Sequence, residues 1–329
     1  PHYKSKQKSK TTPALVIRHN SNISNMQLLK KLCSIHAPSG NEGPMQEFLL
    51  DYIHAEKSNW AVQPEIVHGD DFQHCIVLIF GQPKVAVYAH IDNIGFQVRY
   101  GRQLIKIGGP KVVTGYKLTG RDSNGLVDCE LHVNEEDNSL SYSGDREIDR
   151  GTPLSFKMNF REDNQWVQSC YLDNRLGVYV ALELAKTLEN GVIVFSCWEE
   201  HGGGSVAYIA RYLWERFRLR KALISDITWV TEGVHPGKGV AVSLRDSGIP
   251  RRVYIDEICR ILQQHGIEFQ LEVENAGGSD GNELQKQPYP IDWCFIGAPE
   301  DMVHSPDEKV HKSDIESMIK AYQLLMKAL

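Results

Sequence analysis

The pattern of hydrophobic and polar positions changes several times along the chain, and each change predicts a different kind of segment. Apolar residues at helical spacing predict two amphipathic helices near the beginning, over residues 26–33 and 45–53. Residues 1–23 precede them, with four lysines among serine, glutamine and threonine and no apolar period. We expect these first residues to form a flexible arm.

The middle of the chain is predicted to be β-structure. Short apolar runs at residues 75–80 and 85–89 are typical of buried strands. From there to about residue 160 the chain is rich in glycine, threonine and valine and shows no helical period. We therefore predict a small all-β inserted domain over residues 93–165.

Helical and strand-like patterns alternate in the second half of the chain. A helical pattern over residues 174–188 ends at Asn190-Gly191, and the apolar run 192–197 follows it. The alternation continues with a helix near 205–216, a run at 222–225, a helix over 251–265, a run at 293–296 and a final helix. This order predicts an α/β fold with a doubly wound, mostly parallel sheet and helices on both faces, built from residues 24–92 and 166–329.

Composition and charge narrow the class of protein. Of 329 residues 41% are hydrophobic, which is enough for a large core, and the net charge of −6 gives no reason to expect nucleic acid as a partner. The apolar runs are far shorter than the roughly 20 residues of a membrane-spanning helix, so we expect neither a membrane span nor a signal peptide. Seven scattered cysteines without a CxxC pair predict reduced thiols, and hence a cytoplasmic protein.

Side chains that can bind metal follow several of the apolar runs. In an open α/β sheet the functional site lies outside the carboxyl ends of the strands. The candidates at such places are His90 with Asp92, Glu199 with Glu200, Asp226 and His304, and Asp173 stands just before a predicted helix. Each has an ordinary explanation alone, such as a surface histidine or a helix cap. Their joint occurrence predicts a shared site.

Two histidines and three carboxylates suit a pair of divalent ions with one bridging carboxylate. Such a pair keeps a net positive charge that can acidify a shared water. Asp92, two residues beyond His90 on an extended chain, could accept the other ring N–H of that histidine. If the strand continues through Glu199 and Glu200, they point in different directions, so that one can bind metal while the other accepts a proton.

An ordered set of motifs carries a resemblance to a known family. The motifs are Ala89-His-Ile-Asp-Asn-Ile-Gly-Phe96, Asp173-Asn-Arg-Leu-Gly177, Glu199-Glu200, Asp226, Gly237-Lys-Gly239 with Asp246-Ser-Gly-Ile-Pro250, Gly277-Gly-Ser-Asp280 and His304-Ser-Pro-Asp-Glu308. Together they resemble the dinuclear metallo-aminopeptidases of the glutamyl and deblocking aminopeptidase family, which is known for tetrahedral assemblies. The resemblance extends from about residue 26 to the C-terminus.

The resemblance implies a role for each candidate residue. His90, Asp173 and Asp226 would hold one ion, and Asp173, Glu200 and His304 the other, with Asp173 as the bridge. Glu199 would be the general base and Asp92 would orient His90. The implied activity is hydrolysis of N-terminal residues from peptides by a bridging water that two metals activate. Zinc is the expected metal, with cobalt or manganese as alternatives, and the implied state is a homo-oligomer such as a dodecamer.

Other functions stay open at this stage. The same metal site could deacylate small N-acyl substrates. Paired carboxylates could cleave a glycosidic bond, although that reaction needs two carboxyl groups that face each other, about 5 to 10 Å apart. A scaffold that has lost catalysis is a further alternative, because Asn93 stands where the family usually has Glu. The residues that follow Glu200, as far as Ser205, also differ from the family pattern.

One departure suggests a substrate preference. The family commonly shows Arg-Tyr before the last histidine, whereas this chain has Asp301-Met302 there, preceded by Glu300. Negative charge close to a metal ligand would favour a cationic partner and reject a like charge. We therefore expect acidic N-terminal residues to be poor substrates, and lysine, arginine or neutral residues to be preferred.

Overall fold

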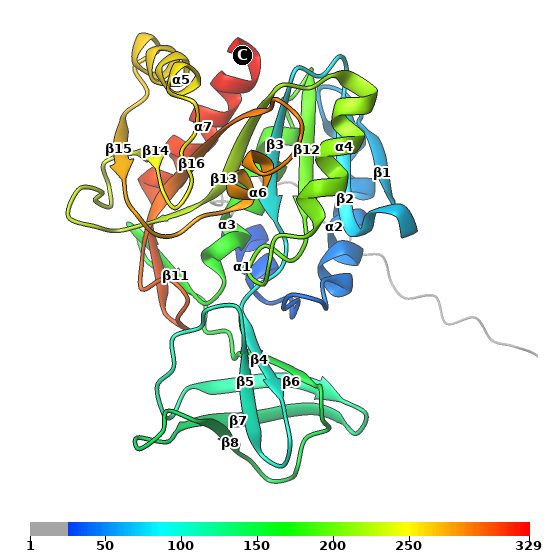
Figure 1. The fold of residues 1–329 in the computed structure, drawn as a ribbon, viewed down its shortest axis with the longest axis vertical. Helices are drawn as coiled ribbons and strands as arrows, with labels where there is room; N and C mark the ends of the chain where they lie inside the picture. The colour runs from blue at the N-terminus through cyan, green and yellow to red at the C-terminus, as the bar shows by residue number, and fades with distance from the viewer. Residues whose placement is uncertain (1–25) are drawn as a thin grey trace, which may run out of the picture.

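A computed structural model describes residues 26–329, so the predicted arm at residues 1–23 lies outside the described residues. A large sheet with helices forms the upper body in Figure 1, and a small barrel lies below it. The chain leaves the sheet for the barrel after residue 90 and returns before residue 172. The mixed α/β fold that the sequence predicts is therefore present.

The large sheet has eleven strands. In spatial order they are β1 (Glu65–Gly69), β2 (Gln73–Phe80), β12 (Gly191–Ser196), β3 (Val85–His90), β13 (Lys221–Trp229), β16 (Asp292–Asp301), β17 (Glu308–His311), β11 (Trp166–Ser169) and β10 (Arg161–Glu162), and β14 (Val240–Arg245) and β15 (Phe269–Val273) join at β16. Strands β2, β3 and β12 are apolar and almost wholly buried, as their continuous hydrophobic runs predict.

The sheet is parallel only in part. Strands β12, β3, β13 and β16 run parallel to their neighbours at the centre, and β14 is parallel to β15. The other six pairings, at both edges and between β14 and β16, are antiparallel. The prediction of a mostly parallel sheet is therefore wrong outside the centre. Antiparallel neighbours need only a short connection, such as the single turn η2 (Asp70–Phe72) between β1 and β2.

Helices cover both faces of the sheet. They are α1 (Met26–Cys33), α2 (Gly43–Glu56) with the short η1 (Lys57–Asn59), α3 (Leu172–Ala185), α4 (Ser205–Phe217), α5 (Arg252–Gln264), α6 (Asp280–Gln285) and α7 (Lys312–Ala328). The Ser225 hydroxyl on β13 donates to the carbonyl of Gly177 in α3. Its neighbour Asp226 accepts from Ser279, directly before α6. Because successive strand residues point to opposite faces, α3 and α6 lie on opposite sides of the sheet.

Six further strands close into a barrel. They are β4 (Gly95–Val98), β5 (Gln103–Ile107), β6 (Lys117–Asp122), β7 (Gly125–Val133), β8 (Leu140–Ser143) and β9 (Pro153–Phe156). The barrel has an apolar core of its own, with Phe96 and Phe156 in edge-to-face contact inside it. Residues 161–162, which the prediction assigned to the insert, form β10 of the large sheet.

Two observations bear on the environment of the protein. All seven cysteines lie in the described part of the chain, and none of them is in a disulfide. Within residues 26–329, no helix combines the length and the apolar character needed to cross a membrane.

Candidate active site

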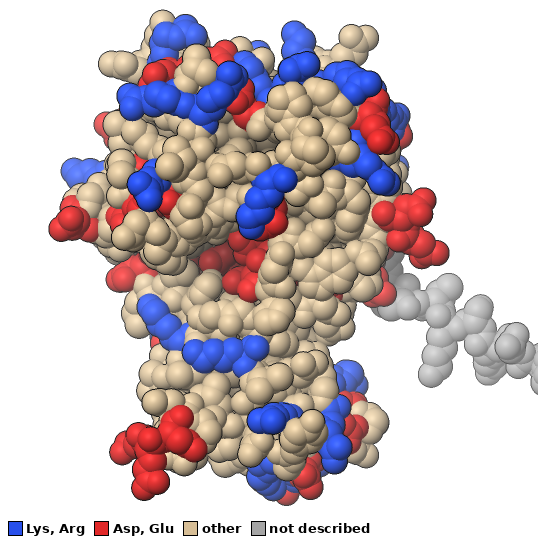
Figure 2. All heavy atoms as spheres, in the orientation of Figure 1, with Lys and Arg blue, Asp and Glu red and all other residues tan. Residues whose placement is uncertain are grey.

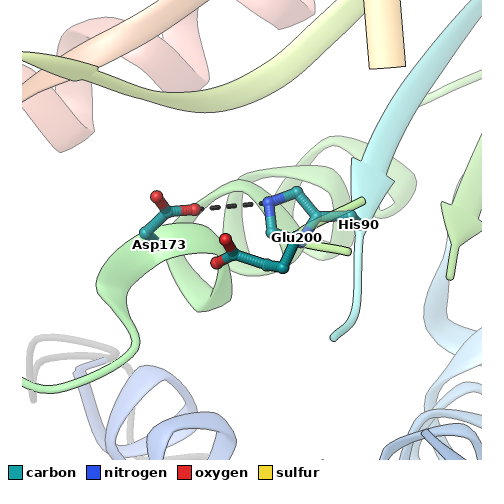
Figure 3. Close-up of side chains that lie close together, drawn as sticks. All are labelled: His90, Asp173 and Glu200. Carbon is teal, nitrogen blue, oxygen red and sulfur yellow. Dashed lines mark ion pairs between the residues drawn. The ribbon is translucent and has the colours of Figure 1, made fainter. Parts of the chain in front are cut away.

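His90 stands at the centre of the predicted cluster. It is the last residue of β3, which lies between β12 and β13, and its side chain is 1% exposed. Its Nδ1 is 3.4 Å from Oδ1 of Asp92, which follows on the same extended chain. Its Nε2 lies 3.2 Å from Oδ1 of Asp173 and 3.4 Å from Oδ2 of Asp226. The strand end therefore holds the ring with one nitrogen toward Asp92 and the other toward the carboxylates of Asp173 and Asp226. Figure 3 shows the contact with Asp173.

Asp173 lies between the two histidines. Its Oδ1 is 3.2 Å from Nε2 of His90, and its Oδ2 is 3.2 Å from Nε2 of His304. The residue opens α3 with non-helical backbone angles, and its peptide bond to Asn174 is cis. Its backbone N–H donates to Oε2 of Glu308 over 3.3 Å. Two oxygens directed at two separate histidines are the arrangement that a bridging carboxylate requires.

Glu199 and Glu200 both reach the cluster. Glu200 Oε2 is 3.3 Å from His304 Nε2, while Glu199 Oε2 is 3.7 Å from His90 Nε2. Strand β12 ends at Ser196, and the chain then turns through Trp198, which has a positive φ of 60°. The alternation expected of a continuing strand therefore does not apply. Each glutamate instead approaches a different histidine from a turn.

Asp92 organises this turn, a role that sequence reasoning missed. Its carboxylate accepts the backbone N–H groups of Glu199 and Glu200, each over 3.1 Å, and the Ser39 hydroxyl over 2.6 Å. Asp92 therefore links the end of β3 to the glutamate turn in addition to facing His90. The spacing of His90 and Asp92 predicts the contact between their two side chains. It does not predict the contact with the glutamate turn, because that turn is more than 100 residues away in sequence.

Glu308 is a second residue that the motifs contain without a predicted role. Its buried carboxyl group accepts the backbone N–H of His304 over 3.0 Å and that of Asp173 over 3.3 Å. Asp226, on β13, is held in a comparable way, since its Oδ2 accepts from the Ser279 hydroxyl over 2.7 Å. Groups from distant segments thus hold Asp173 and Asp226 through hydrogen bonds, and a residue of its own loop holds His304.

Crowding of carboxylates disturbs the pKa values of the cluster. Burial and the nearby Asp173 carboxylate raise the pKa of Glu200 to about 7, and the same two causes raise that of Asp226. Burial alone would lower the pKa of His304, but the hydrogen-bonded carboxylates of Asp173 and Glu200 raise it to about 12. Strong perturbations of this kind are typical of functional sites.

The donor set fits divalent ions. His90, Asp173 and Glu200 can each offer one ligand atom, and these atoms lie within 4.8 Å of one another (Figure 3). Both ring nitrogens of His90 and Oε1 of Glu200 are buried without a hydrogen-bond partner among the described residues. Buried polar atoms without partners are costly, and imidazole with carboxylate is a ligand combination that suits zinc and similar ions. The residues present therefore suit the metal centre that the sequence predicts.

The departures from the family pattern have structural explanations at two positions. Asn93 is buried, its Oδ1 accepts from Arg175 over 2.7 Å, and its amide donates to the carbonyl of Ile94 over 2.7 Å. The Ser205 hydroxyl exchanges hydrogen bonds with the backbone N–H and carbonyl of Cys197 at the start of α4. Both side chains therefore stabilise the scaffold around the cluster.

The third departure from the family pattern, Asp301-Met302 with Glu300 before it, does not have the structure that the expected substrate preference requires. Glu300 is 1% exposed, and burial raises its pKa well above the usual range, while Asp301 is exposed. Glu300 is therefore a buried residue that does not line the cavity beside the cluster, unlike the charge that the expected substrate preference requires. Glu300 follows an apolar run along β16. The sequence does not indicate that the buried part of this strand extends as far as Glu300.

Comparison with known proteins identifies the class. The model of the M42 glutamyl aminopeptidase family matches residues 124–321, and the chain belongs to this family. A protein of Acetivibrio thermocellus named "Putative aminopeptidase" is 27% identical over 340 residues, which cover 92% of this chain and 97% of that protein. The family predicted from the motifs is therefore confirmed, and the chain is a metal-dependent aminopeptidase that hydrolyses peptide bonds.

Solved structures share the fold. Aminopeptidase APDkam598 from the archaeon Desulfurococcus kamchatkensis has a TM-score of 0.81 at 20% identity, covering 92% of this chain and 94% of its own. The TET1 peptidase of Pyrococcus horikoshii, described as assembling into a tetrahedron or a large octahedral shell, has a TM-score of 0.77 at 21% identity, covering 92% and 98%. These similarities show the mixed α/β architecture.

Proposed function

We propose that this aminopeptidase works with two divalent ions, held by five side chains of the cluster. His90, Asp173 and Asp226 would hold one ion, and Asp173, Glu200 and His304 the other. The observation that carries the proposal is the position of Asp173, with one oxygen 3.2 Å from each histidine Nε2. Zinc is the first candidate, and cobalt or manganese would suit the same nitrogen and oxygen ligands.

The remaining residues supply proton transfer and positioning. When bound, the ions would acidify a water and polarise the scissile carbonyl. Glu199 would accept a proton from the attacking water at its carboxylate and return it to the leaving amine. Its carboxylate lines the same cavity as the ligands, within reach of a substrate in that cavity. Asp92 would act as a positioning residue, through His90 on one side and through the backbone of the glutamate turn on the other.

The cavity favours a peptide with a free N-terminus over an N-acyl substrate. Its lining includes seven carboxylate residues and neither lysine nor arginine. An α-ammonium group gains from such surroundings, whereas a neutral acyl amide does not. A glycosidase role is disfavoured because Glu199 and Glu200 adjoin the same cluster of ligands and do not face each other across an open cleft.

A direct experiment compares substrates and metals together. The purified chain is dialysed against a chelator, reloaded with zinc, cobalt or manganese, and assayed on aminoacyl p-nitroanilides and on N-acetyl amino acids. We expect activity to depend on reloading, at about two ions per chain as the two-metal arrangement requires, with anilides cleaved and N-acetyl compounds left intact. Cleavage of the N-acetyl compounds alone would favour the deacylase.

Three further assignments belong to this proposal. We propose a homo-oligomer, because the Pyrococcus horikoshii structure with the same fold assembles into closed shells, and light scattering would test it. We propose a cytoplasmic location, because all seven cysteines are unpaired. We also propose that residues 93–160, which contain the six barrel strands, form an inserted domain, because the barrel has a separate apolar core.

A further inference from the structure

A cavity of about 260 Å³ extends from the cluster toward β14 and β15. Asp173, Glu199, Glu200, Asp226 and His304 line one end of it. The far wall carries three carboxylates without a predicted role, those of Asp246, Glu272 and Glu274. Figure 2 shows acidic side chains recessed in a hollow between the upper body and the barrel.

The acidic wall comes from one corner of the large sheet. Asp246 follows β14 directly, Glu272 lies in β15, and Glu274 follows that strand. Strand β14 pairs antiparallel with β16, the parallel neighbour of β13, and β15 continues the sheet beside β14. The hydroxyl of Thr228, two residues beyond Asp226 on β13, donates to Glu272 of β15, so this corner of the sheet adjoins the cluster. The fold therefore places these acids beside the reacting centre although they belong to no metal motif.

Two of the three acids are buried without a positive partner. Glu272 is 5% exposed and Asp246 is 6% exposed. Glu272 accepts a hydrogen bond from the Thr228 hydroxyl, and Asp246 accepts one from the backbone N–H of Gly248 over 2.6 Å. Within residues 26–329, neither carboxylate is paired with a lysine, arginine or histidine. Burial raises the pKa of both carboxyl groups, and a cation beside them would favour their charged form.

The charge of the cavity is not balanced by the proposed ions alone. Two divalent ions bring four positive charges, which offset the four carboxylates at the metal end. The three acids of the far wall remain in excess. A positive group, at the distance of a side chain from the metals, would offset part of this excess.

The rest of the wall suits an aliphatic chain. Ile227, Trp229 and Phe295 line the cavity between the metal end and the acids. Trp229 is 40% exposed, and a side-chain ring on this wall can also contact a cation. The volume lies below the range of about 300 to 1,000 Å³ that is usual for whole ligands.

We propose that this cavity is a basic-side-chain pocket, which binds the lysine or arginine side chain of the N-terminal residue of the peptide. The inference rests on the proposed function, because the metal end must hold the α-amino group and the scissile carbonyl. The aliphatic part of the side chain would lie along Ile227, Trp229 and Phe295, and the charged end would reach Glu272 and Asp246. An acidic side chain would meet like charges there and be rejected.

The test uses two substrates that differ by one charge. Lysyl and norleucyl p-nitroanilides have side chains of nearly equal length, but only lysine ends in an ammonium group. For the zinc- or cobalt-loaded full chain we expect kcat/KM for lysine to exceed that for norleucine by about tenfold or more, and glutamyl p-nitroanilide to be the poorest of the three. High salt should reduce the preference for lysine.

A matched pair of variants assigns the preference to the pocket. Glu272→Gln removes the charge and keeps the shape, so kcat/KM for lysine should fall about 10- to 100-fold while that for norleucine changes less than about threefold. Glu268→Gln, four residues earlier and exposed outside the cavity, should leave both values unchanged. Asp246→Asn provides a second variant if Glu272→Gln is poorly folded.

The outcomes separate the two proposals. Loss of activity on every anilide with metal bound would overturn the proposed function. Hydrolysis of norleucine without preference for lysine would overturn the pocket and leave the aminopeptidase intact. An unchanged lysine preference in folded Glu272→Gln and Asp246→Asn variants would also overturn the pocket.

Discussion

The side chain of Arg175 connects helix α3 to the end of β3, which carries the predicted site. Its side chain is fully buried, and its guanidinium donates to the backbone carbonyl of Ile91, between His90 and Asp92. It also donates to Oδ1 of Asn93 over 2.7 Å and to the carbonyl of Ile35 over 3.4 Å. One side chain of α3 therefore ties down the end of β3. We predict that Arg175→Met destabilises the protein although it keeps the apolar stem of the side chain.

The size of this effect follows from the bonds that are lost. A hydrogen bond to a charged group contributes about 1.5 to 3 kcal/mol, and each buried acceptor left without a donor costs about 1 to 3 kcal/mol. Relief of the buried charge offsets part of this, so we expect a net loss of about 3 to 5 kcal/mol. With an unfolding entropy of about 2.1 cal/mol/K per residue over roughly 300 residues, the expected fall in Tm is about 5 to 8 °C.

Calorimetry in the presence of a chelator measures this loss apart from any contribution of metal. Arg252→Met is the matched control, because the Arg252 side chain is 74% exposed and its ion pair with Asp256 lies at the surface. We expect the control to change Tm by less than about 1 °C, since surface pairs contribute little. A Tm for Arg175→Met equal to that of the wild type would refute the argument that these hydrogen bonds hold the strand end.

Three further predictions concern the cluster and its surroundings. Asp173→Ala should lower the metal content from about two ions per chain to below one, because both sites share this residue; retention of two ions would contradict the bridge. Glu199→Gln should reduce turnover by a factor on the order of 10² to 10⁴ with metal content unchanged, whereas Glu200→Gln should weaken metal binding, and the reverse pattern would exchange their roles. Burial, with a contribution from Arg175, lowers the pKa of His36 to about 4 in the folded state, below an unfolded value near 6.5. The unfolded chain then binds more protons as the pH falls through this window, so urea titrations should show about 2 kcal/mol less stability from His36 at pH 5 than at pH 7, and His36→Gln should lack this difference.

The gathering of the candidate side chains could be predicted because parallel strands bring their carboxyl ends to one edge of the sheet. His90 and Asp226 could therefore be expected at the same edge, whereas the direct pairing of β3 with β13 is seen only in the structure. The short connection between β1 and β2 indicates an antiparallel pair, but strands that pair over a long sequence separation, such as β2 with β12, carry no such local signal. The orientation of Glu199 and Glu200 was not accessible either, since it depends on the left-handed turn at Trp198.

The acids that line the proposed substrate pocket could not be predicted from the sequence. Sequence comparison drew attention to Glu300 and Asp301 because they precede a predicted metal ligand, but Glu300 is buried and does not line the cavity beside the cluster. The acids on the far wall of that cavity, Asp246, Glu272 and Glu274, come from the ends of β14 and β15, and β14 joins the sheet at β16. Their position depends on long-range pairing and not on spacing. The predicted preference for basic residues therefore remains, with different residues as its cause.

The central claim is that Asp173 bridges two ions between His90 and His304. The most direct measurement is anomalous diffraction from crystals of the zinc-loaded protein, recorded on both sides of the zinc absorption edge. We expect two anomalous peaks per chain, one beside His90 and Asp226 and one beside Glu200 and His304, with an oxygen of Asp173 in contact with each. A single peak, or two peaks of which only one contacts Asp173, would contradict it.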